Sequence, residues 1–157
     1  LCFKIEGINA NSGIQYRSKY LPEQGKWKLG GYQADFDADN EYTGILYEAS
    51  GRGVMTKRGE KVILLPDKKS QSRKLNKSGN SPLHQDNGLI KTGQWYEYRI
   101  IAKEYNFIHI INNQLTVDVI DKDKINRARK GLLGFQLHDG HPMKVEFKNI
   151  RLKKLNP

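Results

Sequence analysis

Two short segments carry polar side chains at every second position, which is the spacing that an acid–base site on β-strands needs. These side chains are Gln33, Asp35 and Asp37 in residues 31–37, and Gln136 and His138 in residues 132–138. Because alternate residues of a strand project from one face, each set can line a single surface. An imidazole titrates near neutral pH, so His138 is the preferred general base or acid. Asp35 is the alternative base, or the group that orients the base, unless it is an ordinary solvated carboxylate.

Further side chains around these segments can bind a ligand. They are Arg17, Tyr47, Arg52 and Lys57, with Glu48 as another carboxylate. Glycine on both sides of Arg52 lets the backbone approach a ligand closely, although an ordinary hairpin turn explains the same pattern. Arg17 has a structural alternative, a salt bridge to Asp35 or Asp37. Tyr47 and Trp95 can each stack on a flat ligand, and for Trp95 core packing is the favoured role.

Metal binding has little support. Asp35, Asp37 and Asp39 offer oxygen ligands of the kind that calcium prefers. Their spacing lacks the glycine and the distal glutamate of an EF-hand loop and begins on a predicted strand. We therefore predict no cofactor, with calcium at these aspartates as the minor alternative. The single cysteine, Cys2, excludes an intrachain disulfide and a cysteine-based zinc site.

The elements that must position these groups are strands, because helical periodicity is nearly absent. Alternating runs predict strands at residues 1–6, 12–18, 31–37, 43–48, 53–57, 61–65, 95–103, 106–111, 115–120, 132–138 and 145–152. Asn112-Asn113 indicates a type I′ hairpin, since asparagine tolerates positive φ. Strands at hairpin spacing predict an all-β sandwich of two antiparallel sheets, with Phe135 and Leu137 facing the core. Residues 66–92 are predicted to form a long polar loop, either a surface excursion or a flap over a ligand.

The composition fits one sandwich domain over residues 1–157, with 37% hydrophobic residues and a net charge of +10. The positive charge is spread out and accompanies no nucleic-acid recognition motif, so nucleic acid is not a favoured partner. A polyanion-binding surface over residues 57–77 stays an alternative. No run is long enough to span a membrane. The first residues already alternate like a strand, so we expect N-terminal strands and an export signal upstream, and a periplasmic or extracellular location.

Four groups of motifs, in order along nearly the whole chain, resemble the 3-keto-disaccharide hydrolase domain family. They are Asn-Ser-Gly-Ile-Gln-Tyr-Arg at residues 11–17; residues 31–37 followed by Thr-Gly-Ile-Leu-Tyr at 43–47; Gly-Gln-Trp-Tyr-Glu-Tyr-Arg-Ile at 93–100 followed by 111–115; and Gly-Leu-Leu-Gly-Phe-Gln-Leu-His at 131–138 followed by 145–152. The resemblance implies a concanavalin A-like jelly roll. It also implies action on sugars oxidised at carbon 3, where the ketone acidifies the hydrogen on carbon 2.

Such a reaction needs a base for that hydrogen, a donor or cation for the enolate oxygen, and an acid for the leaving group. His138, Asp35 and Glu48 are the predicted catalytic candidates. The residues predicted to bind substrate are Arg17, Gln33, Asp37, Tyr47, Arg52, Lys57 and Gln136. Many family members have glutamate where this chain has Gln33 and glutamine where it has Asp35, so the carboxylate is displaced by two residues on one strand face. A non-catalytic carbohydrate-binding module of the same fold is the alternative function.

Overall fold

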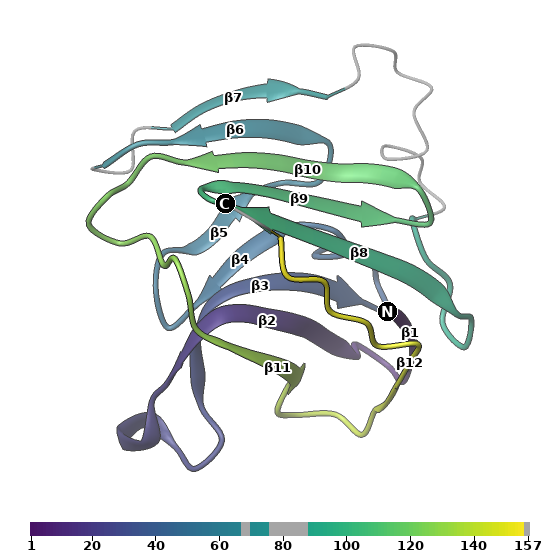
Figure 1. The fold of residues 1–157 in the computed structure, drawn as a ribbon. Helices are drawn as coiled ribbons and strands as arrows, with labels where there is room; N and C mark the ends of the chain where they lie inside the picture. Colours follow the sequence, from purple (N-terminus) through teal and green to yellow (C-terminus); the bar gives the residue numbers. More distant parts are fainter. Residues whose placement is uncertain (67–69, 76–87, 156–157) are drawn as a thin grey trace.

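The computed structural model describes residues 1–66, 70–75 and 88–155, and these form two β-sheets packed face to face (Figure 1). One sheet has seven strands in the order β12-β1-β8-β9-β10-β6-β7, and the other has five in the order β11-β2-β3-β4-β5. The strands are β1 (Cys2–Glu6), β2 (Asn11–Tyr20), β3 (Leu29–Asp37), β4 (Leu46–Ala49), β5 (Gly53–Thr56), β6 (Glu60–Leu64), β7 (Ser70–Lys74), β8 (Tyr96–Lys103), β9 (Asn106–Ile111), β10 (Gln114–Asp121), β11 (Leu132–Leu137) and β12 (Lys144–Lys148). The predicted all-β jelly-roll sandwich is confirmed.

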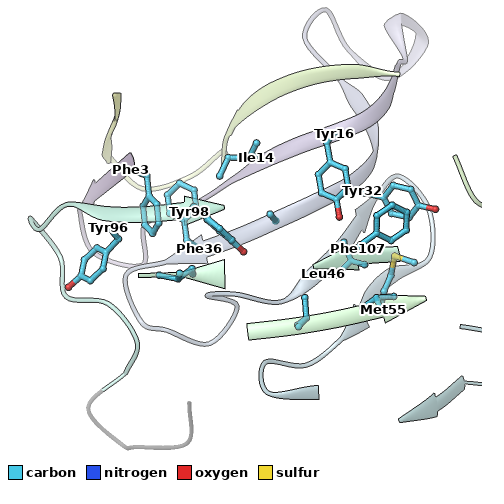
Figure 2. Packing of buried hydrophobic residues seen from close by; sticks show 14 of the residues in the cluster. Phe3, Ile14, Tyr16, Tyr32, Phe36, Leu46, Met55, Tyr96, Tyr98 and Phe107 are labelled. Carbon is cyan, nitrogen blue, oxygen red and sulfur yellow. The ribbon is translucent and has the colours of Figure 1, made fainter. Parts of the chain in front are cut away.

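The core lies between the sheets and is rich in aromatic rings, as Figure 2 shows. Phe3 of the larger sheet lies 3.9 Å from Phe36 of the smaller sheet between ring centroids, and Tyr32 lies 4.4 Å from Phe107. All four side chains are fully buried. These contacts come from the inward residues of alternating strands, which is why the hydrophobic pattern predicted the sandwich.

Most predicted strands are confirmed to within a few residues, and the hairpin at Asn112 and Asn113 has the predicted positive φ at both positions, 45° and 64°. One strand was missed. β7 lies inside the segment that was predicted to be a loop, and it pairs with β6 at the edge of the larger sheet. All its residues are exposed and polar, so no apolar alternation marked it. The remaining parts of the predicted loop at residues 67–69 and 76–87 lie outside the described residues.

β11 is the edge strand of the smaller sheet. Phe135 points toward the core layer as predicted and packs 4.3 Å from Phe147 between ring centroids. Nevertheless Phe135 is 49% exposed and Leu137 64% exposed, so their predicted burial is wrong. Alternation along the strand determines which face a residue points to. Burial also requires neighbouring strands on both sides, and the edge strand β11 has one on a single side.

β10 pairs in parallel with β6, whereas its pairing with β9 is antiparallel. The prediction of purely antiparallel sheets is therefore wrong at this one junction. Within the described residues, no helix is long and apolar enough to cross a membrane.

Candidate active site

The outer face of the five-stranded sheet collects the polar residues that alternate with the core. Strand pairing sets Gln136 beside Gly13 and Gly13 beside Asp35, in one row across β11, β2 and β3. The next row runs from Gly134 through Gln15 and Gln33 to Tyr47. Because paired residues on neighbouring strands project to the same side, these groups share one surface.

Asp35 is the central ionisable group of this face. Its side chain is 5% exposed and accepts a hydrogen bond from Gln33 Nε2 at 2.5 Å. Burial raises the pKa of Asp35 to about 7, against the opposing effect of the Gln33 bond and with a further rise from the charge of Asp37. A carboxyl group with this pKa can both accept and release a proton near neutral pH.

Gly13 makes this arrangement possible. A Cβ atom at position 13 would lie 2.8 Å from Asp35 Oδ1 and 2.8 Å from Gln33 Cγ, which is closer than such atoms approach. The two side chains therefore occupy the space over the backbone that any other residue would fill. Gly13 was quoted in a motif but not predicted as a site residue, because its role depends on which residue lies across from it.

Gln136 supplies a second amide in the same row as Asp35, with Gly13 between them. Its backbone oxygen accepts a hydrogen bond from Ser12 Oγ at 2.6 Å. Its side-chain Oε1 is buried and has no hydrogen-bond partner among the described residues. Buried polar atoms are nearly always paired, so this unpaired amide oxygen in the row of Asp35 is available to a ligand that donates a hydrogen bond.

Asp37, predicted to bind substrate, instead stabilises its own loop. Its carboxylate accepts hydrogen bonds from the amide nitrogens of Glu41 and Tyr42 at 2.9 and 3.0 Å, and from Thr43 Oγ1 at 2.7 Å. The loop thereby holds Tyr42 near the site. The pKa of the Tyr42 phenol is raised, first by a hydrogen bond with Glu41 and also by the charges of Asp37 and Asp35. Sequence reasoning missed Tyr42, which lies in a loop where no periodicity marks it.

His138 follows β11 directly, and its amide nitrogen donates to Asn11 O at 3.3 Å. Alternation from Gln136, continued one residue beyond β11, puts His138 on the same side of the smaller sheet as Asp35. That the two groups meet over one hollow stays a prediction. The ring is exposed, and its Nδ1 lies 2.6 Å from Asp139 O, a distance at which Nδ1–H donates to that carbonyl. His138 therefore lies at the rim of the face, whereas Asp35 lies at its centre.

Arg17 does not join this face. β2 has a bulge between Tyr16 and Lys19, and Arg17 in the bulge adopts φ 49°. The guanidinium donates to three backbone carbonyls, those of Ala102, Glu104 and Ala128, and lies 5.2 Å from the centroid of the Phe107 ring. Its predicted convergence with Asp35 is wrong, because the bulge reverses the parity on which it relied.

Glu48 and Arg52 also lie away from the face. Glu48 pairs with the core residue Tyr32, so it points between the sheets. Arg52 Nε lies 2.6 Å from Glu48 Oε2, and Arg52 Nη2 lies 2.7 Å from Asp121 Oδ2 on the opposite sheet. Their predicted catalytic and substrate-binding roles are replaced by a buried ion-pair network.

The remaining candidates divide between the face and its surroundings. Tyr47 is half-buried in the row with Gln33, where its ring can contact a ligand. Lys57 is exposed after the end of β5. Trp95 directly precedes β8 of the larger sheet, is 36% exposed and has Lys148 Nζ 3.9 Å from its ring centroid. The favoured role in core packing is therefore wrong, and stacking on a ligand stays a prediction.

A metal site has no support from the side chains that the structure describes, which contain no group of three or more histidine, cysteine, aspartate or glutamate residues arranged as ligands. In the predicted calcium run, Asp37 is occupied by its own loop and Asp39 is exposed.

The comparison with known families agrees with the fold. A family model described as the 3-keto-alpha-glucoside-1,2-lyase-like domain matches residues 1–153. No curated protein matches the chain. The match covers all the strands of both sheets and the whole of the polar face around Asp35. The chain therefore belongs to the 3-keto-disaccharide hydrolase domain family, a glycoside-hydrolase-like family that carries this 1,2-lyase-like domain.

Proposed function

We propose that the protein cleaves 3-keto-glycosides by elimination across carbons 1 and 2 of the sugar, followed by hydration, with Asp35 as the general base. The observation that carries this proposal is the buried Asp35 carboxyl with a pKa of about 7 on a polar sheet face. The family description, a lyase-like domain acting at carbons 1 and 2 of a 3-keto-glucoside, supports the substrate class.

In the first step, the Asp35 carboxylate removes the hydrogen on carbon 2 as a proton. The electron pair of that bond moves toward the carbon 3 ketone and forms an enolate. Burial raises the pKa of Asp35, which makes the carboxylate a stronger base than an exposed aspartate while leaving it ionised above pH ~7. The protonated carboxyl is then the form that burial favours.

In the second step, the enolate collapses, the bond from carbon 1 to the leaving oxygen breaks, and that oxygen leaves with the electron pair and takes up a proton. The amide of Gln33, which contacts Asp35, and the amide of Gln136, in the same row of the sheet, can donate to the enolate oxygen. The leaving oxygen can take its proton from Asp35 itself, from Tyr42 or from His138 at the rim. Water then adds across the double bond to complete hydrolysis.

This route explains why one central carboxyl is sufficient. Ordinary glycosidases use two opposed carboxylates to stabilise a cationic sugar. The neighbouring carboxylate of Asp37 is committed to its loop by hydrogen bonds. A ketone that acidifies the adjacent hydrogen removes the need for the second carboxylate.

The direct test is to incubate the protein with a 3-keto-disaccharide and, separately, with the same disaccharide before oxidation. Cleavage of the keto sugar alone, with the unsaturated keto sugar or its hydrate as product, is the expected result. kcat/KM should rise with pH through about 7, as Asp35 loses its proton. Binding without any cleavage would identify a non-catalytic carbohydrate-binding module instead.

Three variants assign the base. Asp35→Asn should lower kcat by more than ~100-fold, the usual scale for loss of a general base. Asp39→Asn, at an exposed aspartate in the same run, is the matched control and should leave kcat unchanged. His138→Ala should lower kcat less than Asp35→Asn does, and the reverse order would transfer the role of base to His138.

A further inference from the structure

A cavity lies away from the polar face around Asp35. It has a volume of about 500 Å³ and is lined by the β8–β9 turn, by Arg17 in the bulge of β2, and by Arg129 and Leu155. Figure 1 shows the segment that follows β12, in yellow, running toward β8 and β9, and Leu155 of this segment contributes to the cavity wall. None of the residues around Asp35 lines this cavity.

The backbone conformation at Arg17 directs its side chain to the cavity. Arg17 and Glu104 have φ values of 49° each, a left-handed conformation that is uncommon for residues other than glycine. Arg17 Nη1 donates to Glu104 O and Nη2 donates to Ala102 O at 3.1 Å, so the hairpin turn and the bulge hold the guanidinium in place. Bulges often redirect a side chain in this way at binding sites.

A second guanidinium of the cavity wall, that of Arg129, is oriented by Tyr105, with its Cζ 5.2 Å from the ring centroid. Arg129 Nη2 donates a hydrogen bond to Tyr105 Oη, and Arg127 stacks on the Tyr105 ring with its Cζ 3.5 Å from the centroid. Lys103 adds an exposed ammonium at the same wall. Stacked guanidinium groups are pre-organised donors for planar or tetrahedral oxyanions.

Positive charge exceeds negative charge in the lining of this cavity, where Arg17, Lys103 and Arg129 face one carboxylate. Among the described side chains, the ion pairs involve Arg52, Arg99 and lysines of other strands, and neither Arg17, Lys103, Arg127 nor Arg129 takes part in one. Glu104 is the single acidic residue of the cavity lining. Cations gathered in a concave site focus the potential and attract an anion.

We propose that this cavity binds an acidic sugar, with the sugar's oxyanion held by Arg129 and Lys103 and oriented by the fixed charge of Arg17. The volume exceeds what an inorganic oxyanion needs, and the apolar Leu155 and Ala102 in the wall suit the C–H groups of a sugar ring. A uronate carboxylate supplies the required charge. This site is separate from the Asp35 face and does not depend on the proposed reaction.

The test is a titration of the ¹⁵N-labelled protein with glucuronate, followed by amide resonances of residues 102–105 and 129. Saturable shifts confined to these residues are expected with glucuronate, and none with glucose at the same concentrations. Sulfate should compete, since it shares the oxyanion. The affinity should fall as the salt concentration rises.

The double variant Lys103→Gln, Arg129→Gln should weaken glucuronate binding at least about tenfold, because charge-assisted hydrogen bonds are lost. Lys19→Gln with Lys91→Gln removes the same charge from exposed positions elsewhere and should bind like the wild type. Asp35→Asn should also keep full binding. Absence of saturable shifts, or equal affinity in the Lys103/Arg129 variant and the wild type, would overturn the proposal.

Discussion

Two buried ionisable side chains give this protein opposite responses to pH. Asp35 has a pKa raised by burial to about 7. His109 lies between the sheets, with Nε2 3.0 Å from Tyr16 Oη and Nδ1 3.1 Å from Ile45 O, and burial lowers its pKa to about 3. Each pKa shift makes the free energy of unfolding depend on pH, because folded and unfolded chains bind different numbers of protons.

Asp35 should destabilise the fold at alkaline pH. Between its unfolded pKa near 4 and its folded pKa of about 7, the folded state holds the proton more tightly, so stability falls as pH rises through this window. Asp35→Asn should therefore raise the free energy of unfolding at pH 8 and change it little at pH 4. Urea denaturation at both pH values measures the difference, and equal effects at pH 4 and pH 8 would contradict a raised pKa.

His109 acts in the opposite sense. Its neutral form is favoured in the folded state, so the stability that it contributes is present above pH ~6.5 and is lost as pH falls toward 3. His109→Gln should lower stability at neutral pH, since the imidazole bridges Tyr16 and Ile45, but should flatten the acid side of the stability profile. The slope of unfolding free energy between pH 6 and pH 4 is the measurement, and an unchanged slope would refute the assignment.

At the scale of elements, β2 decides what the smaller sheet presents to solvent. Gly13 gives Asp35 and Gln33 room to fold over the strand, and the bulge at Arg17 sends the next cation to the far side of the strand. β2 therefore contributes to two separate sites: the polar face around Asp35 and the cavity lined by Arg17. This separation depends on Gly13, which has no side chain, and on the bulge at Arg17. Both are local features of β2.

Gly13→Ala should remove activity without unfolding the sheet. The added methyl group would lie within 2.8 Å of both Asp35 Oδ1 and Gln33 Cγ and would displace the pair. We expect kcat on the 3-keto-disaccharide to fall at least about tenfold, the cost of ~1.4 kcal/mol in the barrier, with far-ultraviolet circular dichroism unchanged. Gly53→Ala is the comparison: its Cβ would meet no neighbour, but its φ of 77° strains the backbone, so it can cost stability and should leave kcat normal. A Gly13→Ala enzyme with normal kcat would show that the pair need not lie over β2.

For the whole molecule, a buried charge network joins the two sheets at one end. Arg52 contacts Glu48 on its own sheet and Asp121 and Asp123 on or beside β10 of the other, while Tyr32 Oη donates to Asp121 Oδ2 at 2.7 Å. Three carboxylates converge on one guanidinium, so its removal leaves like charges buried together. Of this network, only Glu48 and Arg52 were predicted as site residues, and their contacts instead join the two sheets.

Arg52→Met should destabilise the protein by ~3–5 kcal/mol at neutral pH, the cost of leaving buried carboxylates unpaired. The loss should shrink at pH 4, where the carboxylates gain protons. Arg99→Met removes an exposed arginine whose ion pair with Glu97 should be worth less than ~1 kcal/mol. Thermal and urea unfolding measure the loss in free energy of unfolding for both variants. An equally small loss for both would show that Arg52 does not stabilise the fold through its buried carboxylates.

Much of the fold could be predicted because alternation is a local property. The strands around Gln33, Asp35 and Gln136 were located correctly, and their parity placed these residues on one face. The same rule failed for Arg17, where a bulge breaks the alternation, and for Glu48, whose face is set by its pairing with Tyr32. The alternation rule also missed β7. This strand is held by backbone hydrogen bonds to β6, and its side chains carry no apolar pattern that would mark it.

What the sequence by itself determined is therefore the class of fold, the family and the row of polar residues that includes Asp35. Tertiary structure decided which of these residues is buried, which charges are neutralised and which remain open to a ligand. The physical reason is range: side-chain alternation is fixed by neighbours along the chain, whereas burial, and with it the pKa of Asp35, depends on atoms that other strands bring close.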